Sequence, residues 1–174
     1  MSRDLNHLDP DFRQKVNTLL GKVNSESDQY QLRVFYTRRD CHEQARLWRQ
    51  SRSSEEIRRG VRELRRNGAD WVADCIIDCG PQYGRWATNA KPGQSWHQWG
   101  LAVDCFVAAG GRAIWDSSHV GYQRYAAIAQ ELGLEAGAYW RRRDAVHVQS
   151  DDCRVMDKYT WREMDAKMCH RFSA

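Results

Sequence analysis

Apolar residues recur every three or four positions in some stretches of the chain and alternate with polar residues in others. Phe12, Val16 and Leu19 follow Asp9-Pro10 at helical spacing, and an aspartate before a proline is typical of a helix start. The same spacing predicts further helices over 41–50, 53–67, 70–79 and 122–132. Short apolar or alternating runs predict strands over 32–36, 101–107, 113–115 and 147–149.

This mixture of elements indicates an α+β fold, with a small, mainly antiparallel sheet flanked by helices. The chain has 174 residues, which fits one domain over 1–174 with a helical insert at about 53–80. Repeats and low-complexity tracts are absent from the sequence. Residues 81–96 are punctuated by glycine and proline, so we expect them to form a loop that suits the rim of a cleft.

The chain carries a formal net charge of +4, and the excess is arginine. These arginines cluster before and within the predicted insert: Arg46, Arg49, Arg52, Arg58, Arg59, Arg62, Arg65 and Arg66. Those of the predicted helix lie mostly off its apolar stripe, which favours a solvated helix face. The alternative is contact with an anionic partner, either nucleic acid or the cell envelope. No recognition motif accompanies the arginines, so nucleic acid is not the expected partner.

No apolar run in the sequence approaches the length of a membrane span, and the first residues lack the apolar core of a signal peptide. We therefore expect synthesis in the cytoplasm without a Sec signal. Six cysteines are expected to remain thiols there: Cys41, Cys75, Cys79, Cys105, Cys153 and Cys169. Cys75 and Cys79 could instead be metal ligands, although their spacing favours one face of a helix.

The most informative stretch of the chain begins Ser95-Trp96-His97, turns at Gly100 and reaches Asp104 in an apolar strand. A catalytic zinc site uses three protein ligands from histidine, cysteine or carboxylate and leaves the fourth position to water. His97 and Asp104 are two such ligands. Gly100 between them allows the chain to turn tightly.

A second segment, Asp144-Ala-Val-His147, offers a third ligand at His147. The carboxylate of Asp144 could take a proton from a metal-bound water, or it could pair with the arginines 141–143. His97, Asp104 and His147 therefore predict one Zn²⁺ ion. We assign structural or surface roles to the other histidines: His7, His42, His119 and His170.

The string Ser-x-His-x-x-Gly-x-Ala-x-Asp, followed by acid-x-x-His, resembles the LAS zinc metallopeptidases of peptidase family M15. This family includes D-alanyl-D-alanine carboxypeptidases and the L-alanyl-D-glutamate endopeptidases of phage endolysins. Upstream, Thr37-Arg38-Arg39-Asp40, Gln44 and Gln50-Ser51-Arg52 are similar to its early signatures. The chain departs from the pattern at Ser51, where a glycine is usual, and at Val146 and Val148, which replace the usual proline and phenylalanine.

The resemblance implies a fold like that of the DD-peptidases and hedgehog proteins. It also implies hydrolysis of the stem peptide of peptidoglycan, between L-alanine and D-glutamate. Asp144 then acts as general base, and Arg39 stabilises the oxyanion, unless Arg39 is only a surface arginine. Ser95 binds substrate or supports a turn, and Trp96 and Trp140 line the groove or pack in the core.

Two other functions remain open. A D-alanyl-D-alanine carboxypeptidase or dipeptidase needs a cation for the terminal carboxylate of its substrate, whereas an endopeptidase needs an open-ended cleft. A zinc-binding relative without catalysis is the second alternative, and the presence of Asp144 argues against it. The expected protein is a monomer without a separate wall-binding domain, and as an endolysin it reaches the cell wall in the periplasm through a holin.

Overall fold

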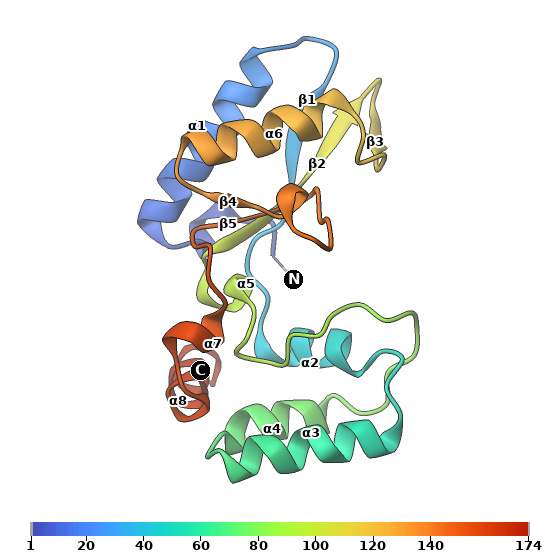
Figure 1. The fold of residues 1–174 in the computed structure, drawn as a ribbon, viewed down its shortest axis with the longest axis vertical. Coiled ribbons are helices and arrows are strands. Elements are labelled where there is room, and N and C mark those ends of the chain that lie inside the picture. The colour runs from blue at the N-terminus through green and yellow to red at the C-terminus, as the bar shows by residue number, and fades with distance from the viewer. Residues whose placement is uncertain (1, 174) are drawn as a thin grey trace. The chain divides into compact units, whose positions relative to one another are not determined.

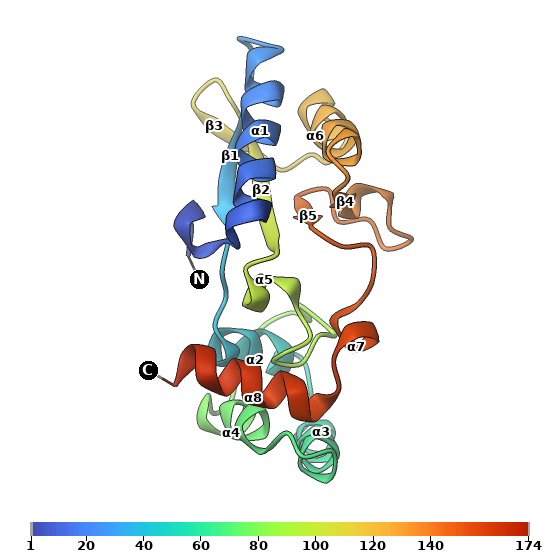
Figure 2. The same cartoon turned by 90° about the vertical axis from the view of Figure 1, so that its left-hand side faces the viewer.

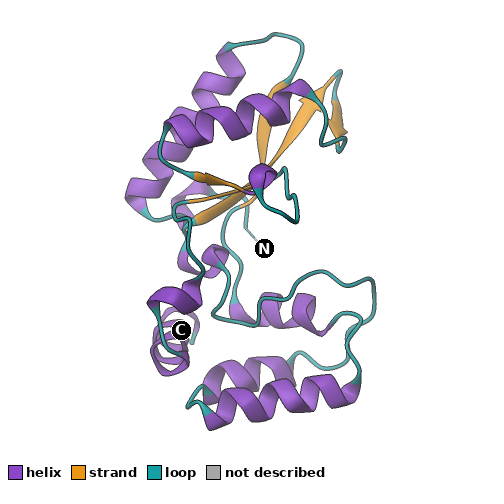
Figure 3. Ribbon diagram, in the orientation of Figure 1, coloured by secondary structure: helices purple, strands orange, loops and turns teal. Residues whose placement is uncertain are grey.

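The computed structural model describes residues 2–173, which divide into two compact units. The first, here called the sheet unit, comprises residues 2–38 and 99–152. The second, here called the helical unit, comprises residues 39–98 and 153–173. All strands of the described residues belong to the sheet unit, as the colouring by secondary structure shows (Figure 3). The predicted α+β class is confirmed, and the role of both units in one catalytic domain stays a prediction.

The sheet unit is built on five antiparallel strands (Figure 1). They are β1 Gln31–Tyr36, β2 Ala102–Ala109, β3 Arg112–Ile114, β4 Glu135–Ala136 and β5 His147–Gln149. The order is β1-β2-β5-β4, with β3 paired to β2. The central strand β2 therefore pairs with strands that lie far before and after it in the sequence.

Two helices bury their apolar sides against one face of this sheet. They are α1 Pro10–Ser25 and α6 Val120–Glu131, and α1 runs along the strands in Figure 2. From β2 this core face receives Val103, Cys105 and Val107. Successive side chains of a strand point to opposite faces, so the intervening residues of β2 lie on the face away from this core. We call that second side the open face.

A bulge in β1 lies next to the centre of the open face. Val34 pairs with Cys105 and Tyr36 with Asp104, so Phe35 is the extra residue between two consecutive pairs. Bulges re-aim side chains and are common beside functional sites. Here the bulge places Tyr36 directly across from Asp104.

The helical unit consists of short helices joined by loops. Its helices are α2 Cys41–Arg49, α3 Ser54–Arg66, α4 Asp70–Asp78, α5 Trp96–Trp99, α7 Val155–Lys158 and α8 Trp161–Phe172. The last residue of α5, Trp99, is already the first residue of the second segment of the sheet unit. Helix α4 packs against α2, α3 and α8. The predicted helices 41–50, 53–67 and 70–79 are confirmed, whereas α5, α7 and α8 have no counterpart in the prediction.

Side chains next to the first turn cap the starts of two predicted helices. The Asp9 carboxylate accepts hydrogen bonds from the amides of Asp11 and Phe12 and so caps α1. Ser53 forms a capping box with Glu56 at the start of α3. Two 3₁₀ turns, Leu5–His7 and Gly137–Tyr139, were not anticipated.

The structure also describes the cysteines, His119 and the arginines of α3, for which the sequence made predictions. All six cysteines lie among the described residues, and none of them forms a disulfide. His119 caps α6 through Nδ1, which accepts from the Gly121 amide at 3.0 Å. In α3, Glu55 pairs with Arg58 and Arg62 across exposed helix surface.

Among the described residues, no helix combines the length and the apolar character that a membrane crossing requires.

Candidate metal centre

Asp104 and His147 meet on neighbouring strands of the open face. They are directly paired in the β2–β5 ladder, although 43 positions separate them in sequence. The Asp104 Oδ1 and His147 Nδ1 atoms lie 3.0 Å apart, and only 8% and 9% of the two residues is exposed. Two ligands bound at about 2 Å to one zinc ion lie roughly this far apart.

The second ring nitrogen of His147 is held by Gln149, which lies two residues further on the same strand face. The Gln149 amide nitrogen donates to the Asp151 carbonyl, so its Oε1 faces the histidine and accepts from Nε2–H at 3.1 Å. This contact keeps a proton on Nε2 and leaves Nδ1 as the nitrogen that faces Asp104. Metal-binding histidines commonly have one nitrogen fixed in this way and the other available to the metal.

The charge state of His147 follows from the same contacts. Burial disfavours the imidazolium and lowers its pKa, whereas the hydrogen bond to Asp104 and the negative charges of Asp104 and Asp144 raise it. The net effect is a pKa raised above the ordinary value for histidine. The pair therefore attracts a positive charge to Nδ1.

A glycine brings Asp144 next to His147. A Cβ atom at Gly137 would lie 2.6 Å from the Asp144 carbonyl oxygen and 3.2 Å from the His147 Cβ, so this position has no room for a side chain. The Gly137 carbonyl accepts from the Asp144 amide at 2.9 Å, and the Asp144 carbonyl accepts from the His147 amide at 3.3 Å. The Asp144 side chain itself is exposed.

Trp140 packs beside the same histidine. Its ring centroid lies 5.0 Å from that of His147, and its indole N–H donates to Glu135 at 2.8 Å. The half-buried indole thus has one side against a candidate ligand. The thiol of Cys105, which follows Asp104 but points into the core, is not a candidate nucleophile, because burial raises its pKa to about 12.

His97, Ser95 and Trp96 lie at the start of α5, in the helical unit. His97 is 2% exposed, and its carbonyl accepts from the Arg39 amide at 3.5 Å. The Ser95 carbonyl accepts from the Gln98 amide, so Ser95 helps to form this turn of helix. Trp96 is 5% exposed and donates to the Cys153 carbonyl at 2.8 Å, which favours the packing role for this indole.

Arg39 is anchored by a neighbouring polar side chain. Its Nη1 donates to Gln44 Oε1 at 3.1 Å, and Gln44 is fully buried and donates in turn to the Ala90 carbonyl. The early arginine and the early glutamine of the sequence resemblance therefore contact each other.

The turn between His97 and Asp104 depends on Gly100, whose φ is +74°. A Cβ atom there would approach the His7 carbonyl oxygen to 2.9 Å. His97, Asp104 and His147 supply two imidazoles and one carboxylate, a donor set whose chemistry fits a divalent metal ion. The chemistry of this donor set is what supports the fit.

Three residues around this centre were missed by the sequence analysis: Tyr36, Gly137 and Gln149. Gln149 carried a usable signal, because it lies two positions after His147 in a predicted strand and hence on the same face. Tyr36 could not be found without the strand register. Gly137 could not be found without the approach of Asp144, which no local pattern encodes.

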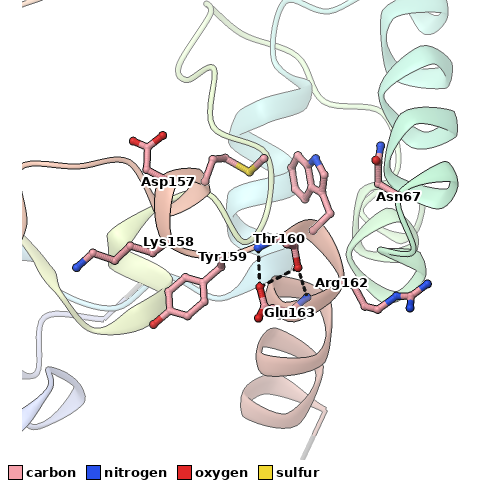
Figure 4. A pocket seen from close by; sticks show the side chains of 9 residues that line it. Asn67, Asp157, Lys158, Tyr159, Thr160, Arg162 and Glu163 are labelled. Carbon is pink, nitrogen blue, oxygen red and sulfur yellow. Dashed lines mark hydrogen bonds between the residues drawn. The ribbon is translucent and has the colours of Figure 1, made fainter.

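A hollow of about 470 Å³ in the helical unit offers no comparable chemistry (Figure 4). It is lined by Asn67 and residues 156–163. Its central polar groups are engaged in helix capping, since Glu163 Oε2 accepts from both the amide and the hydroxyl of Thr160 at 2.8 Å. None of the titratable side chains described in this hollow belongs to a potential metal-binding group, as Asp104 and His147 do.

Comparison with known proteins agrees with this centre. Residues 88–150 match the model of an M15 peptidase family described as D-alanyl-D-alanine carboxypeptidase. The matched segment holds all three candidate ligands and Asp144, so the chain resembles a peptidase of this class there. No curated protein sequence matches the chain.

One similar solved structure is the L-Ala D-Glu endopeptidase ChiX of Serratia marcescens. The likeness covers 83% of this chain and 81% of that one, at 17% sequence identity and a TM-score of 0.46.

Proposed function

We propose that this protein is a zinc-dependent peptidase that hydrolyses the stem peptide of peptidoglycan. The observation that carries the proposal is the Asp104–His147 pair, buried and in register on two strands inside the segment that matches the peptidase family. Gln149 fixes the histidine tautomer that leaves Nδ1 available to a metal. A purely structural histidine does not need one ring nitrogen held by Gln149 and the other turned toward a buried carboxylate.

In this proposal His97, Asp104 and His147 hold the ion. A zinc ion held by these residues would act as a Lewis acid and would supply a water-derived nucleophile at neutral pH.

Asp144 and Arg39 perform the proton transfer and charge stabilisation. The exposed carboxylate of Asp144, held beside His147 by the turn at Gly137, accepts the proton of the attacking water and passes it to the leaving amine. Arg39, oriented by Gln44, is the cation for the oxyanion that develops on the scissile carbonyl. Ser95 and Trp140 contact the substrate, and Trp96 supports the fold of α5.

The scissile bond that we propose is L-alanyl-D-glutamate, as in endolysins, with action on the cell wall after release from the cytoplasm by a holin. The alternative is removal of terminal D-alanine, which the description of the matched family favours. A monomer suffices for either reaction, because no partner residue is required by the proposed roles.

The deciding experiment is mass spectrometry of purified muropeptides after digestion by zinc-loaded, chelator-treated and zinc-restored protein. We expect products cut after L-alanine, loss of cleavage with the chelator and recovery with zinc. His97→Ala should lose the bound zinc by elemental analysis, whereas Cys75→Ser/Cys79→Ser should keep it. Full zinc in His97→Ala would remove this residue from the centre, and release of free D-alanine would favour the alternative.

A further inference from the structure

The open face carries a second feature beside the candidate metal centre. Asp104 and Phe106 alternate with core residues of β2, so both side chains lie on this face, about 7 Å apart along the strand. Arg33 of β1 pairs with Phe106, so its side chain also lies on the open face. Ala113 of β3 pairs with Ala108, which lies on the open face as well, so the next residue after Ala113 that points to this face is Trp115. The face is thus continuous from the metal centre to Trp115.

Three aromatic rings gather at this end of the sheet. Phe106 and Trp115 are stacked with centroids 5.7 Å apart and an interplanar angle of 27°. Phe35, the bulged residue of β1, contacts Trp115 edge to face at 5.1 Å and Phe106 at 6.1 Å. Trp115 is 57% exposed, so a large apolar ring is held in a fixed position at the surface. We call Phe35, Phe106 and Trp115 the aromatic platform.

Polar groups surround the platform. The Arg3 guanidinium lies 5.8 Å from the Phe35 ring centroid, and the exposed side chain of Arg33 projects from β1 beside Phe106. Arg143 donates to the Ser117 carbonyl at 2.9 Å, which ties the loop that follows Trp115 to the loop that precedes His147. A hydrogen bond within the sheet unit therefore connects the loop after Trp115 to the loop that carries Asp144.

We propose that the aromatic platform binds a sugar ring of the glycan strand, next to the stem peptide that occupies the metal centre. Sugar rings have apolar C–H faces that stack on aromatic rings, and hydroxyl and acetamide groups that hydrogen-bond to flanking arginines. The inference rests on the proposed function, which it extends from the peptide to the glycan to which the peptide is attached.

The size of the platform suits a sugar better than a second protein chain. An aromatic side chain buries about 150–250 Å² at most, and Phe35 and Phe106 are already half-buried. The exposed remainder is smaller than the roughly 800 Å² per partner that stable complexes bury. The arginine rim also disfavours an acyl chain, which has no polar groups to satisfy these donors.

The location of the platform bears on the scissile bond. In peptidoglycan the first residue of the stem, L-alanine, is attached directly to a sugar, whereas the terminal D-alanine lies several residues away. A sugar bound about two strand residues from Asp104 is compatible with cleavage after the first stem residue. The platform therefore supports the L-alanyl-D-glutamate bond over the carboxypeptidase alternative.

The test compares two substrates: a stem peptide attached to its disaccharide and the same peptide without sugar. The measured quantity is the ratio of kcat/KM for the two substrates. We expect Trp115→Ala to lower this ratio about tenfold, the effect of losing one good aromatic contact. Trp115→Phe, which keeps a ring, should restore most of it. Tyr83→Ala, which removes another aromatic ring that is 89% exposed, should leave the ratio as in the unmodified protein.

A binding measurement separates this inference from the proposed function. Saturation-transfer NMR with the peptide-free disaccharide should show contact with the zinc-loaded protein and lose it in Trp115→Ala. If the disaccharide binds at Trp115 but neither substrate is cleaved, the proposed function fails and the platform stands. An unchanged ratio together with unchanged saturation transfer would overturn the platform, as would a dimer that Trp115→Ala converts to monomer.

Discussion

The sheet unit and the helical unit are specified by interactions of different range. In the helical unit, α3 and α8 begin at the capping boxes of Ser53 and Thr160, and Glu55 pairs with Arg62 within one helix. In the sheet unit, the decisive contact joins Asp104 to His147 across 43 positions. Helix ends are stabilised by sequence neighbours, whereas the candidate metal centre exists only when distant strands pair in one register.

This difference predicts that changes in the two units have different consequences. Asp144, the exposed carboxylate beside the metal centre, can be altered without loss of the fold, because its side chain adds little to the core. Changes to turns and caps in the helical unit should alter stability and leave the chemistry intact. The following substitutions test this separation, beginning with the largest expected effect.

Asp144→Ala should lower turnover about 100-fold or more and leave the melting temperature and zinc content unchanged. The exposed carboxylate contributes little to stability, whereas positioned proton transfer commonly contributes 10²- to 10⁴-fold to a rate. Turnover is measured per zinc-loaded, folded molecule, with Asp28→Ala as a matched exposed carboxylate of the same unit. Normal turnover by Asp144→Ala would exclude it as the general base.

Gly137→Ala should affect stability and turnover together. The new Cβ would lie 2.6 Å from the Asp144 carbonyl oxygen, so the backbone must move, at a cost of about 1–3 kcal/mol. Because the same shift displaces Asp144 relative to His147, we expect turnover to fall as well. Thermal melts and kinetics measure both effects.

Gly21→Ala is the control for this substitution, because beyond its chain neighbours and the backbone of α1 no atom lies within 4 Å of the new Cβ. It should stabilise the protein slightly, since alanine favours a helix over glycine. Equal behaviour of the two variants would show that Gly137 is not required by close packing.

Ser51→Gly should stabilise the protein by about 0.5–1 kcal/mol without changing turnover. Ser51 has a φ of +59° and is the one described non-glycine residue with positive φ, a conformation that is strained for a side chain. Its hydroxyl donates to the exposed Gly84 carbonyl, and loss of that bond offsets part of the gain. Denaturant titration measures the change, and Ser51→Ala, which loses the bond but keeps the strain, should be less stable than the original. A destabilised Ser51→Gly would show that the hydroxyl contact outweighs the strain.

Most elements of the fold were predictable because their signals are local. Apolar spacing located α1, α2, α3, α4 and α6, and Asp9 marked the start of α1. The prediction missed α8, whose buried residues Trp161, Met164 and Met168 give a narrower apolar stripe. It also missed the single turns of α5 and α7. Short elements depend on tertiary contacts more than on their own propensities.

The sequence by itself determined the chemical types at the centre: the order of His97, Asp104, Asp144 and His147, the turn at Gly100 and the strands that carry the carboxylate and the second imidazole. These follow from residue identity and from spacing along a single element.

Only the tertiary structure decided the register that pairs Asp104 with His147, the bulge that places Tyr36 opposite the carboxylate, the hold of Gln149 on Nε2 and the space at Gly137. The physical reason is that a one-residue slip in strand pairing moves every side chain to the other face of the sheet, and no local pattern encodes the pairing partner.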